Sequence, residues 1–392
     1  MQFLTIILME ILVGAEVDLY VPSFPELIDT FALTPFMVEM TLSINLLAHC
    51  LSALFVGNMG DRYGRKPVIQ YGLIVFIIGS ILCSFATSYT MLLVGRFLQG
   101  LGVSGPAVLA YIIIADQYSP QEQQSKMGVL NGTIALAMAM APVFGSFVTK
   151  YYHWQGNFYI LLALGIVCLI MGQIFLKDHH KNQDLSLSLK QYVPIFKSSK
   201  ALLFILTVIL MIQAYWVLIG MSPIYYMETL GVSIDAFGFY QGSMAGAFAI
   251  TSITSAYWLK KYGQERCFFV SIGMMILFLF GLCTYLALGI QDPNILTFLL
   301  LVQSVGIVFP VNLLWPLALE TVHGARGRLA ALLVSARLVL TAVGIQTASY
   351  FYGNNFMSIG LIMGITLFGS FYALYLLLRK YNIFTMPSAQ KA

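Results

Sequence analysis

The chain has 392 residues, of which 59% are hydrophobic and only 9% are charged, and its formal net charge is +4. A soluble domain cannot bury so large an apolar fraction, so the composition predicts a membrane protein with many spans. Lys and Arg do not cluster with aromatic residues, which argues against a nucleic-acid partner. The five cysteines form no CxxC pair, so we expect neither a metal site nor a cofactor.

Twelve stretches are long and apolar enough to cross a bilayer, which takes about 20 residues. We predict them at 3–23, 36–57, 67–87, 90–114, 126–150, 154–176, 201–222, 234–259, 266–289, 295–320, 326–351 and 356–379. The polar segment 177–200 separates two sets of six. The sequence therefore predicts an all-α fold with an N-terminal six-helix bundle (1–176), a cytoplasmic linker (177–200) and a C-terminal bundle with a short tail (201–392).

The two halves echo each other, because MGDRYG (59–64) follows the second span and WLKKYG (258–263) follows the eighth. Transporters built from such repeats place their substrate between the halves, in a central cavity near the bilayer midplane. With both termini in the cytoplasm, 17 of the 20 Lys and Arg residues lie on the cytoplasmic side. The positive-inside rule therefore predicts this orientation.

The first span, within LMEILVGAEVDLYVPSFPE (8–26), carries Glu10, Glu16 and Asp18. An acid at the centre of a membrane helix costs about 2.5–3.5 kcal/mol, so it needs a partner, a cavity or a proton. Glu10 and Asp18 are about 80° apart around a helix axis and about 12 Å apart along it, so they can face one cavity. Glu16 points about 200° away from Asp18, which predicts contact with a neighbouring helix or the outer interface.

The loop GNMGDRYGRKP (57–67) between the second and third spans resembles the loop signature of the major facilitator superfamily. Twelve spans agree with that resemblance. The glycines permit tight turns and close helix approach. The charges can hold one conformation shut and must separate in the other. We therefore assign a gating role to six residues of this loop: Gly57, Asp61, Arg62, Gly64, Arg65 and Lys66.

Two further stretches resemble motifs of proton-coupled drug antiporters: RFLQGLGVSGPA (96–107) in the fourth span and LAMAMAPVFGSF (136–147) in the fifth. Ala141 and Ser146 stand where the second motif usually has glycines, which weakens it as a marker of export. The end of the first span and SPIYYMETLGVS (222–233) look like the Bcr/CflA branch of drug/proton antiporters. The small residues and the proline of these motifs are expected to allow close helix packing; they are Gly100, Gly102, Gly105, Pro142 and Gly145.

The resemblance implies that Glu10 and Asp18, followed by Pro22, exchange protons and substrate. Asp18 and Arg96 both lie about 7–9 Å below the predicted outer face. In the family fold the first and fourth spans pack together, so we expect Asp18 to contact Arg96. Burial favours the protonated form of a carboxyl group, and a neighbouring arginine favours the ionised form. A proton and a substrate can therefore compete for such a group. A permanent structural Asp–Arg bridge is the alternative.

Arg337 lies near the middle of the eleventh span, where the family pattern usually has a neutral residue. An arginine at that depth is a functional candidate, and it can bind a substrate carboxylate or phosphate. A pair with Glu320 or another internal acid is the alternative. Other residues that could contact substrate, or equally be packing residues, are Tyr20, Asn45, His49, Gln213, Trp216, Tyr226, Gln241, Asn312 and Trp315.

The sequence thus predicts a monomeric secondary transporter of the bacterial inner membrane, with protons and a small molecule as its partners. The leading hypothesis is drug or metabolite export by proton antiport with alternating access. The second is transport of an anionic metabolite or a carboxylate-type metal chelate such as a siderophore, favoured by Arg337 and the altered fifth-span motif. A membrane enzyme or sensor is the third, although HExxH, GxSxG and P-loop motifs are absent from the sequence.

Overall fold

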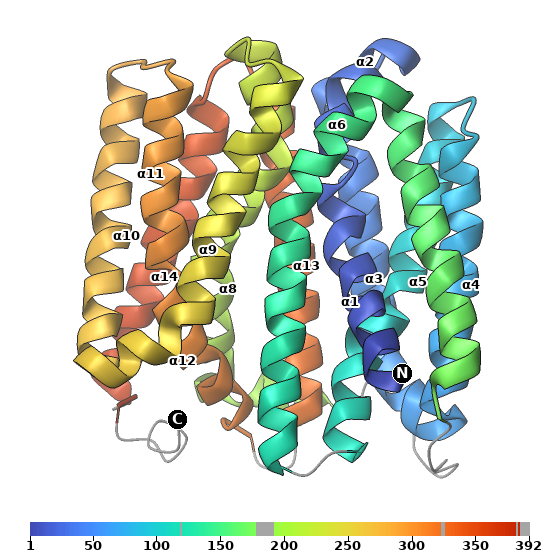
Figure 1. The fold of residues 1–392 in the computed structure, drawn as a ribbon. Coiled ribbons are helices and arrows are strands. Elements are labelled where there is room, and N and C mark those ends of the chain that lie inside the picture. Colours follow the sequence, from blue (N-terminus) through green and yellow to red (C-terminus); the bar gives the residue numbers. More distant parts are fainter. Residues whose placement is uncertain (118–119, 178–191, 323–325, 382, 385–392) are drawn as a thin grey trace. The chain divides into compact units, whose positions relative to one another are not determined.

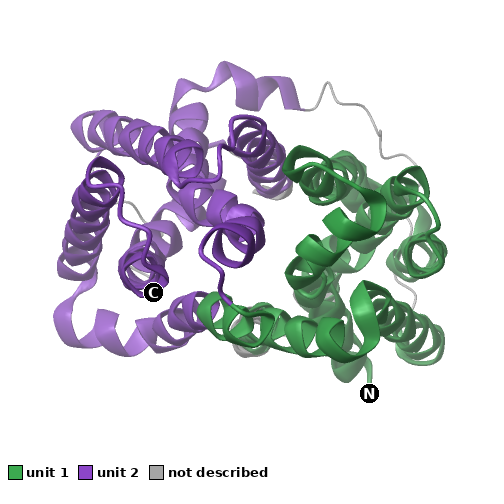
Figure 2. Cartoon of the chain, turned by 90° about the horizontal axis from the view of Figure 1, so that it is seen from above, with its two compact units in different colours: residues 1–188, 233–242 green, residues 189–232, 243–392 purple. Residues whose placement is uncertain are grey.

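The computed structural model describes residues 1–117, 120–177, 192–322, 326–381 and 383–384, and this part of the chain is helical (Figure 1). It divides into two compact units, coloured in Figure 2. Unit 1 comprises residues 1–188 and 233–242, and unit 2 comprises residues 189–232 and 243–392. Residues 178–191, most of the predicted linker, lie outside the described residues.

Unit 1 contains four long single helices and one that reverses. Its elements are α1 (Gln2–Asp18), the 3₁₀ turn η1 (Val21–Ser23), α2 (Phe24–Phe31), α3 (Pro35–Tyr63), α4 (Arg65–Ser84), α5 (Tyr89–Gln117) and α6 (Pro120–Phe175). α6 turns back at His153, whose φ of 59° and ψ of 179° are not helical. Figure 1 shows this reversal beside α2, where the His153 ring lies 2.8 Å from the Glu26 carboxylate.

Unit 2 is also built of long helices, and more of these helices are interrupted. Its elements are α7 (Val193–Lys197), α8 (Ser199–Pro223), the π-helix η3 (Ile224–Thr229), α9 (Ile234–Tyr262), α10 (Gln264–Ala287), α11 (Pro293–Gly306), α12 (Val308–Leu319), α13 (Arg326–Tyr350) and α14 (Met357–Lys380). The first turns of α9, up to residue 242, group with unit 1. α8 packs against α13 and α14.

The all-α fold predicted from hydropathy is confirmed. Among the described residues, nine helical stretches are long and apolar enough to cross a membrane, and one of them contains both arms of α6. With α1 and α9 added, the two arms of α6 counted separately and α11 and α12 counted as one, the described helices are consistent with the twelve predicted spans.

Two prolines explain where the helices depart from the predicted spans. α1 ends at Asp18 rather than at residue 23, because Pro22 has no N–H to donate to the Asp18 carbonyl. The predicted span 295–320 is broken after Gly306, since Pro310 likewise cannot donate to the Gly306 carbonyl. Each break leaves backbone at a helix end inside an apolar unit.

Candidate functional site: buried charges in each unit

All three acids of α1 are buried: Glu10 is 0% exposed, Glu16 1% and Asp18 4%. Arg96 of α5 is also fully buried, and its Nη2 lies 3.7 Å from the Glu16 carboxylate. Its Nη1 donates to the Gln99 side-chain oxygen at 2.7 Å. The guanidinium also stacks over the Tyr20 ring, 4.2 Å from its centroid. The arginine is therefore held by an acid, an amide and an aromatic ring.

The expected contact between Asp18 and Arg96 is wrong, because the structure pairs Arg96 with Glu16. Asp18 is the last residue of α1 instead of lying inside a longer helix. Glu16 and Asp18 point in opposite directions around the axis, and the face that carries Glu16 is the one that meets Arg96. Asp18 lies close enough to Glu16 for the two carboxyl groups to interact electrostatically.

Asn45 of α3 ties this pair to a third helix. Its amide nitrogen donates to the Arg96 backbone carbonyl at 3.1 Å, and its side chain lies beside the Glu16 carboxyl group. His49, one turn further along α3, is half-buried. The polar cluster thus joins α1, α3 and α5.

Glu10 lies apart from this cluster, deeper along α1. Its carboxylate oxygens are buried and accept no hydrogen bond from the residues that the structure describes. It interacts electrostatically with Tyr111 of α5. A buried carboxylate without a cation is costly, so this position suits a proton or a cationic group of a ligand.

Glu39 of α3 is a fourth buried acid that our sequence analysis did not select. Its signal was present, since residue 39 falls inside the predicted span 36–57.

The loop between α3 and α4 forms a compact charged cluster. Gly64 has φ 97°, a conformation that favours glycine. The Arg65 guanidinium lies 3.4 Å from Asp61 and donates to the Ile112 carbonyl of α5 at 2.9 Å. Lys66 donates to the Gln173 carbonyl of α6 at 2.7 Å. These contacts connect α3 and α4 to α5 and α6.

Two further residues of the loop motif are placed differently from each other. Arg62 lies over the Tyr63 ring, with its guanidinium carbon 5.4 Å from the ring centroid. Gly57 forms neither the tight turn nor the close helix approach that we expected of it. It lies inside α3, and a side chain added there would meet nothing within 4 Å.

The glycine motifs of the fourth and fifth spans do bring backbones together. A Cβ at Gly100 would overlap the Asn45 carbonyl oxygen, and one at Gly102 would overlap the Gly72 carbonyl oxygen. A Cβ at Gly145 would overlap the Leu19 carbonyl oxygen, whereas Gly105 has room for one. Pro142 lies inside α6. The close approach at Gly100 brings α5 against α3, and the one at Gly145 brings α6 against the turn that follows α1.

Gly145→Ala is expected to lower the free energy of unfolding by about 1–3 kcal/mol, the usual cost of overpacking a close contact. The added methyl would push α6 away from the turn after Asp18. Gly132→Ala on the same helix is the matched control, since nothing lies within 4 Å of its added methyl. Thermal denaturation of the two purified variants in detergent checks this, and equal stabilities would contradict it.

Arg337 of α13 in unit 2 is half-buried and has no acidic partner among the described residues. Its guanidinium carbon lies 5.0 Å from the Trp216 ring centroid of α8, and its Nε has no hydrogen-bond partner in the described part of the chain. Gln213, one turn before Trp216, donates to the Leu340 carbonyl of α13 at 2.7 Å. The expected alternative, a pair between Arg337 and Glu320, is not formed.

The remaining candidates of the second half lie on three different elements, η3, α9 and α12. Tyr226 is buried, with its hydroxyl 2.7 Å from that of Thr297 on α11, which is a packing role. Gln241 is buried on α9, and neither its amide nitrogen nor its oxygen has a hydrogen-bond partner in the described structure. On α12, Asn312 is exposed and Trp315 is half-buried.

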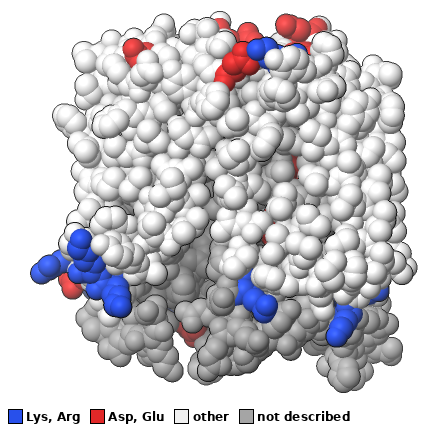
Figure 3. Space-filling model, in the orientation of Figure 1, with Lys and Arg blue, Asp and Glu red and all other residues white. Residues whose placement is uncertain are grey.

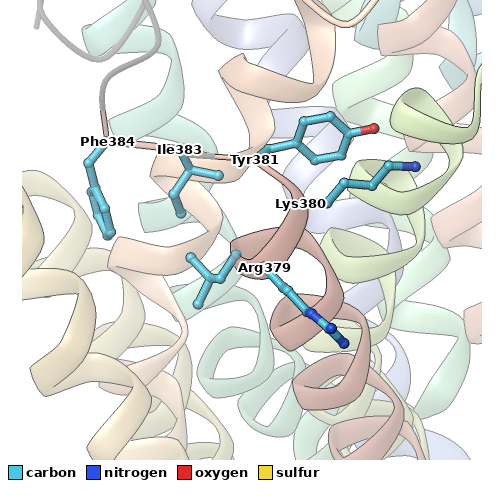
Figure 4. A pocket seen from close by; sticks show the side chains of 6 residues that line it. Arg379, Lys380, Tyr381, Ile383 and Phe384 are labelled. Atoms are coloured by element: carbon cyan, nitrogen blue, oxygen red, sulfur yellow. The ribbon is translucent and has the colours of Figure 1, made fainter.

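A separate recess of about 360 Å³ lies at the end of α14 (Figure 4). It is lined by Leu378, Arg379, Lys380, Tyr381, Ile383 and Phe384. None of these residues belongs to the charged clusters described above. Among the described residues, His, Cys, Asp and Glu form no group of three or more suited to a metal ion.

Comparison with known proteins agrees with this arrangement of helices. The Multidrug resistance proteins MdtL of Salmonella heidelberg (strain SL476) and Salmonella dublin are each 26% identical to the chain over 269 residues, which is 68% of either sequence.

Similar solved structures include a D-xylose-proton symporter, with a TM-score of 0.74 at 16% identity, covering 95% of this chain and 96% of that one. A bacterial homolog of the human lysosomal transporter Spinster gives 0.73 at 14% identity and 97% of both chains. The sequence profile of the Major Facilitator Superfamily matches residues 6–345. The chain is therefore a multi-pass membrane transporter and belongs to the major facilitator superfamily.

Proposed function

We propose that the protein is a proton-coupled antiporter of the Bcr/CflA type that exports a small organic molecule across the bacterial inner membrane. The observation that carries this proposal is the set of three buried acids in α1, of which Glu16 pairs with the buried Arg96. The name of the MdtL relatives, multidrug resistance proteins, supports export as the direction. We further propose that the transporter works as a monomer.

The charge balance of α1 supports a proton as the coupling ion. Glu10, Glu16 and Asp18 are buried, and Arg96 contacts one of them. Uncompensated ions in an apolar interior cost several kcal/mol each, so the other two carboxyl groups favour protons or a cationic ligand. Arrival of substrate then favours release of a proton, and arrival of a proton favours release of substrate.

The charged loop supports a gate at the other end of unit 1. Asp61, Arg65 and Lys66 hold α3 and α4 to α5 and α6, and these contacts must change when the cavity opens on that side. Figure 3 shows most of the visible Lys and Arg at one end of the helices and most of the visible acids at the other. This distribution supports a cytoplasmic position for the loop and for both termini.

Asp18→Asn is expected to abolish transport driven by a pH gradient, because the neutral amide cannot release a proton. The measurement is counterflow in proteoliposomes with cationic, neutral and polycarboxylate compounds, with and without a pH gradient. Glu265→Gln, which changes an exposed acid of α10, is the control. Gradient-driven flux of parental size in Asp18→Asn would remove Asp18 from the coupling machinery.

A second candidate function is transport of an anionic metabolite or a carboxylate-type chelate. Arg337 favours it, since this half-buried cation lies over Trp216 and faces no acid of the described structure. The same counterflow panel separates the two functions, because polycarboxylates would then exchange in place of cations.

A further inference from the structure

Glu39 lies in the second turn of α3, which begins at Pro35 after the capping residue Thr34. Its side chain is 0% exposed, and neither carboxylate oxygen has a hydrogen-bond partner in the described structure. An ionised carboxylate in such a place loses its hydration, and no hydrogen bond or cation compensates for that loss. A neutral, protonated carboxyl group avoids most of that cost.

Tyr20 connects Glu39 to the arginine of the α1 cluster. Its hydroxyl lies 3.1 Å from the Thr41 hydroxyl, and its ring covers the Arg96 guanidinium. It also interacts electrostatically with Glu39. Tyr20 is therefore in reach of both the isolated acid and the buried cation.

The Tyr20 hydroxyl donates its proton to Thr41 and not to Glu39. The Thr41 hydroxyl donates to the Val38 carbonyl at 2.6 Å, so in the Tyr20–Thr41 bond it is Tyr20 that donates. The Tyr20 oxygen keeps its acceptor sites. A carboxylate at Glu39 can only accept hydrogen bonds, and no donor of the described structure reaches its oxygens.

The other titratable groups around this site leave Glu39 without a cation. Glu16 and Asp18 lie on α1, and Arg96 on α5 already contacts Glu16. Tyr89 of α5 donates to the Met37 carbonyl at 2.8 Å. In the described structure the guanidinium thus contacts one of these three carboxyl groups, and protons spare the other two the cost of a buried charge.

We propose that Glu39 is an additional proton-carrying group of the transport cycle, working beside the acids of α1 and electrically linked to them through Tyr20 and Arg96. This inference rests on the proposed proton-coupled function and deepens it. Hydronium delivers a proton to the Glu39 carboxylate, one O–H bond forms and water is left; release reverses the step. Glu39 lies about 6 Å from the start of α3, within reach of protons entering from that end.

The test is a pH titration of the purified protein by infrared spectroscopy, which detects protonated carboxyl groups and needs no substrate. In Glu39→Gln the pH-dependent carboxylic-acid signal should fall by about one carboxyl group. Tyr20→Phe keeps the ring over Arg96 but removes the hydroxyl that interacts electrostatically with Glu39, so the Glu39 signal should persist at a shifted frequency. Glu265→Gln, at an exposed acid, should leave the signal unchanged.

Two results would overturn the proposal. If the carboxylic-acid signal that disappears in Glu39→Gln does not change with pH in the parent, Glu39 is permanently protonated and structural. An unchanged spectrum in Glu39→Gln would mean that Glu39 does not bind the proton at all, and Tyr20→Phe would then also match the parent. If the parent itself shows no titrating buried carboxyl group, proton coupling as a whole fails, and that outcome differs from a failure at Glu39 alone.

Discussion

Arg96→Gln is expected to abolish transport and to lower the free energy of unfolding by about 3–5 kcal/mol, the cost of removing one partner of a buried ion pair. Glu16 would lose its cation, and the Tyr20 ring and the Gln99 oxygen would lose the guanidinium that they contact. Chemical denaturation and proteoliposome flux measure the two effects. Arg266→Gln, at an exposed arginine of α10, is the matched control.

A double variant separates a functional pair from a structural bridge. Replacing a buried pair by apolar residues of similar size is often neutral for stability. Glu16→Met with Arg96→Met should therefore recover most of the stability lost in Arg96→Gln, while transport stays absent. Recovery of gradient-driven transport along with stability would mean that the pair only holds α1 and α5 together.

Hydropathy predicted most of the fold because the lipid imposes it. Each span must satisfy its own backbone, so a long apolar run in this chain becomes a helix. The ends were harder to predict where prolines intervene. Pro22 and Pro310 end α1 and α11 early, yet both lie in runs that remain apolar, so composition alone gave no boundary there.

The site was predicted less completely, because sequence spacing gives angles around one helix and not the direction of its neighbours. Helical geometry correctly separates Glu16 from Asp18, but the face that meets α5 depends on packing. Gly145 lets α6 approach the end of α1 closely, and Gly100 lets α5 approach α3 closely. These two contacts set the packing. Arg96 was identified from its motif, whereas its partner required the three-dimensional structure.

Arg337→Gln is expected to weaken binding of anionic compounds by about 2–5 kcal/mol, the cost of breaking a buried charge pair from one side. The guanidinium lies against the Trp216 ring, and no carboxylate of the described structure balances it. An anionic ligand would supply that balance. Ligand binding to the purified variant and parent, with matched anionic and cationic compounds, measures the effect.

Arg337→Lys should recover only part of the loss, because a point charge replaces the planar guanidinium that binds a carboxylate through two hydrogen bonds and stacks on an aromatic face. Trp216→Phe keeps an aromatic face beside Arg337 and should cost less than Arg337→Gln, since a smaller ring attracts the cation more weakly. Cationic and neutral compounds should bind Arg337→Gln as well as the parent, or better. Equal losses for anions and cations would mean that Arg337 supports the packing of α13 on α8, and the export of cations would then be the better account of this transporter.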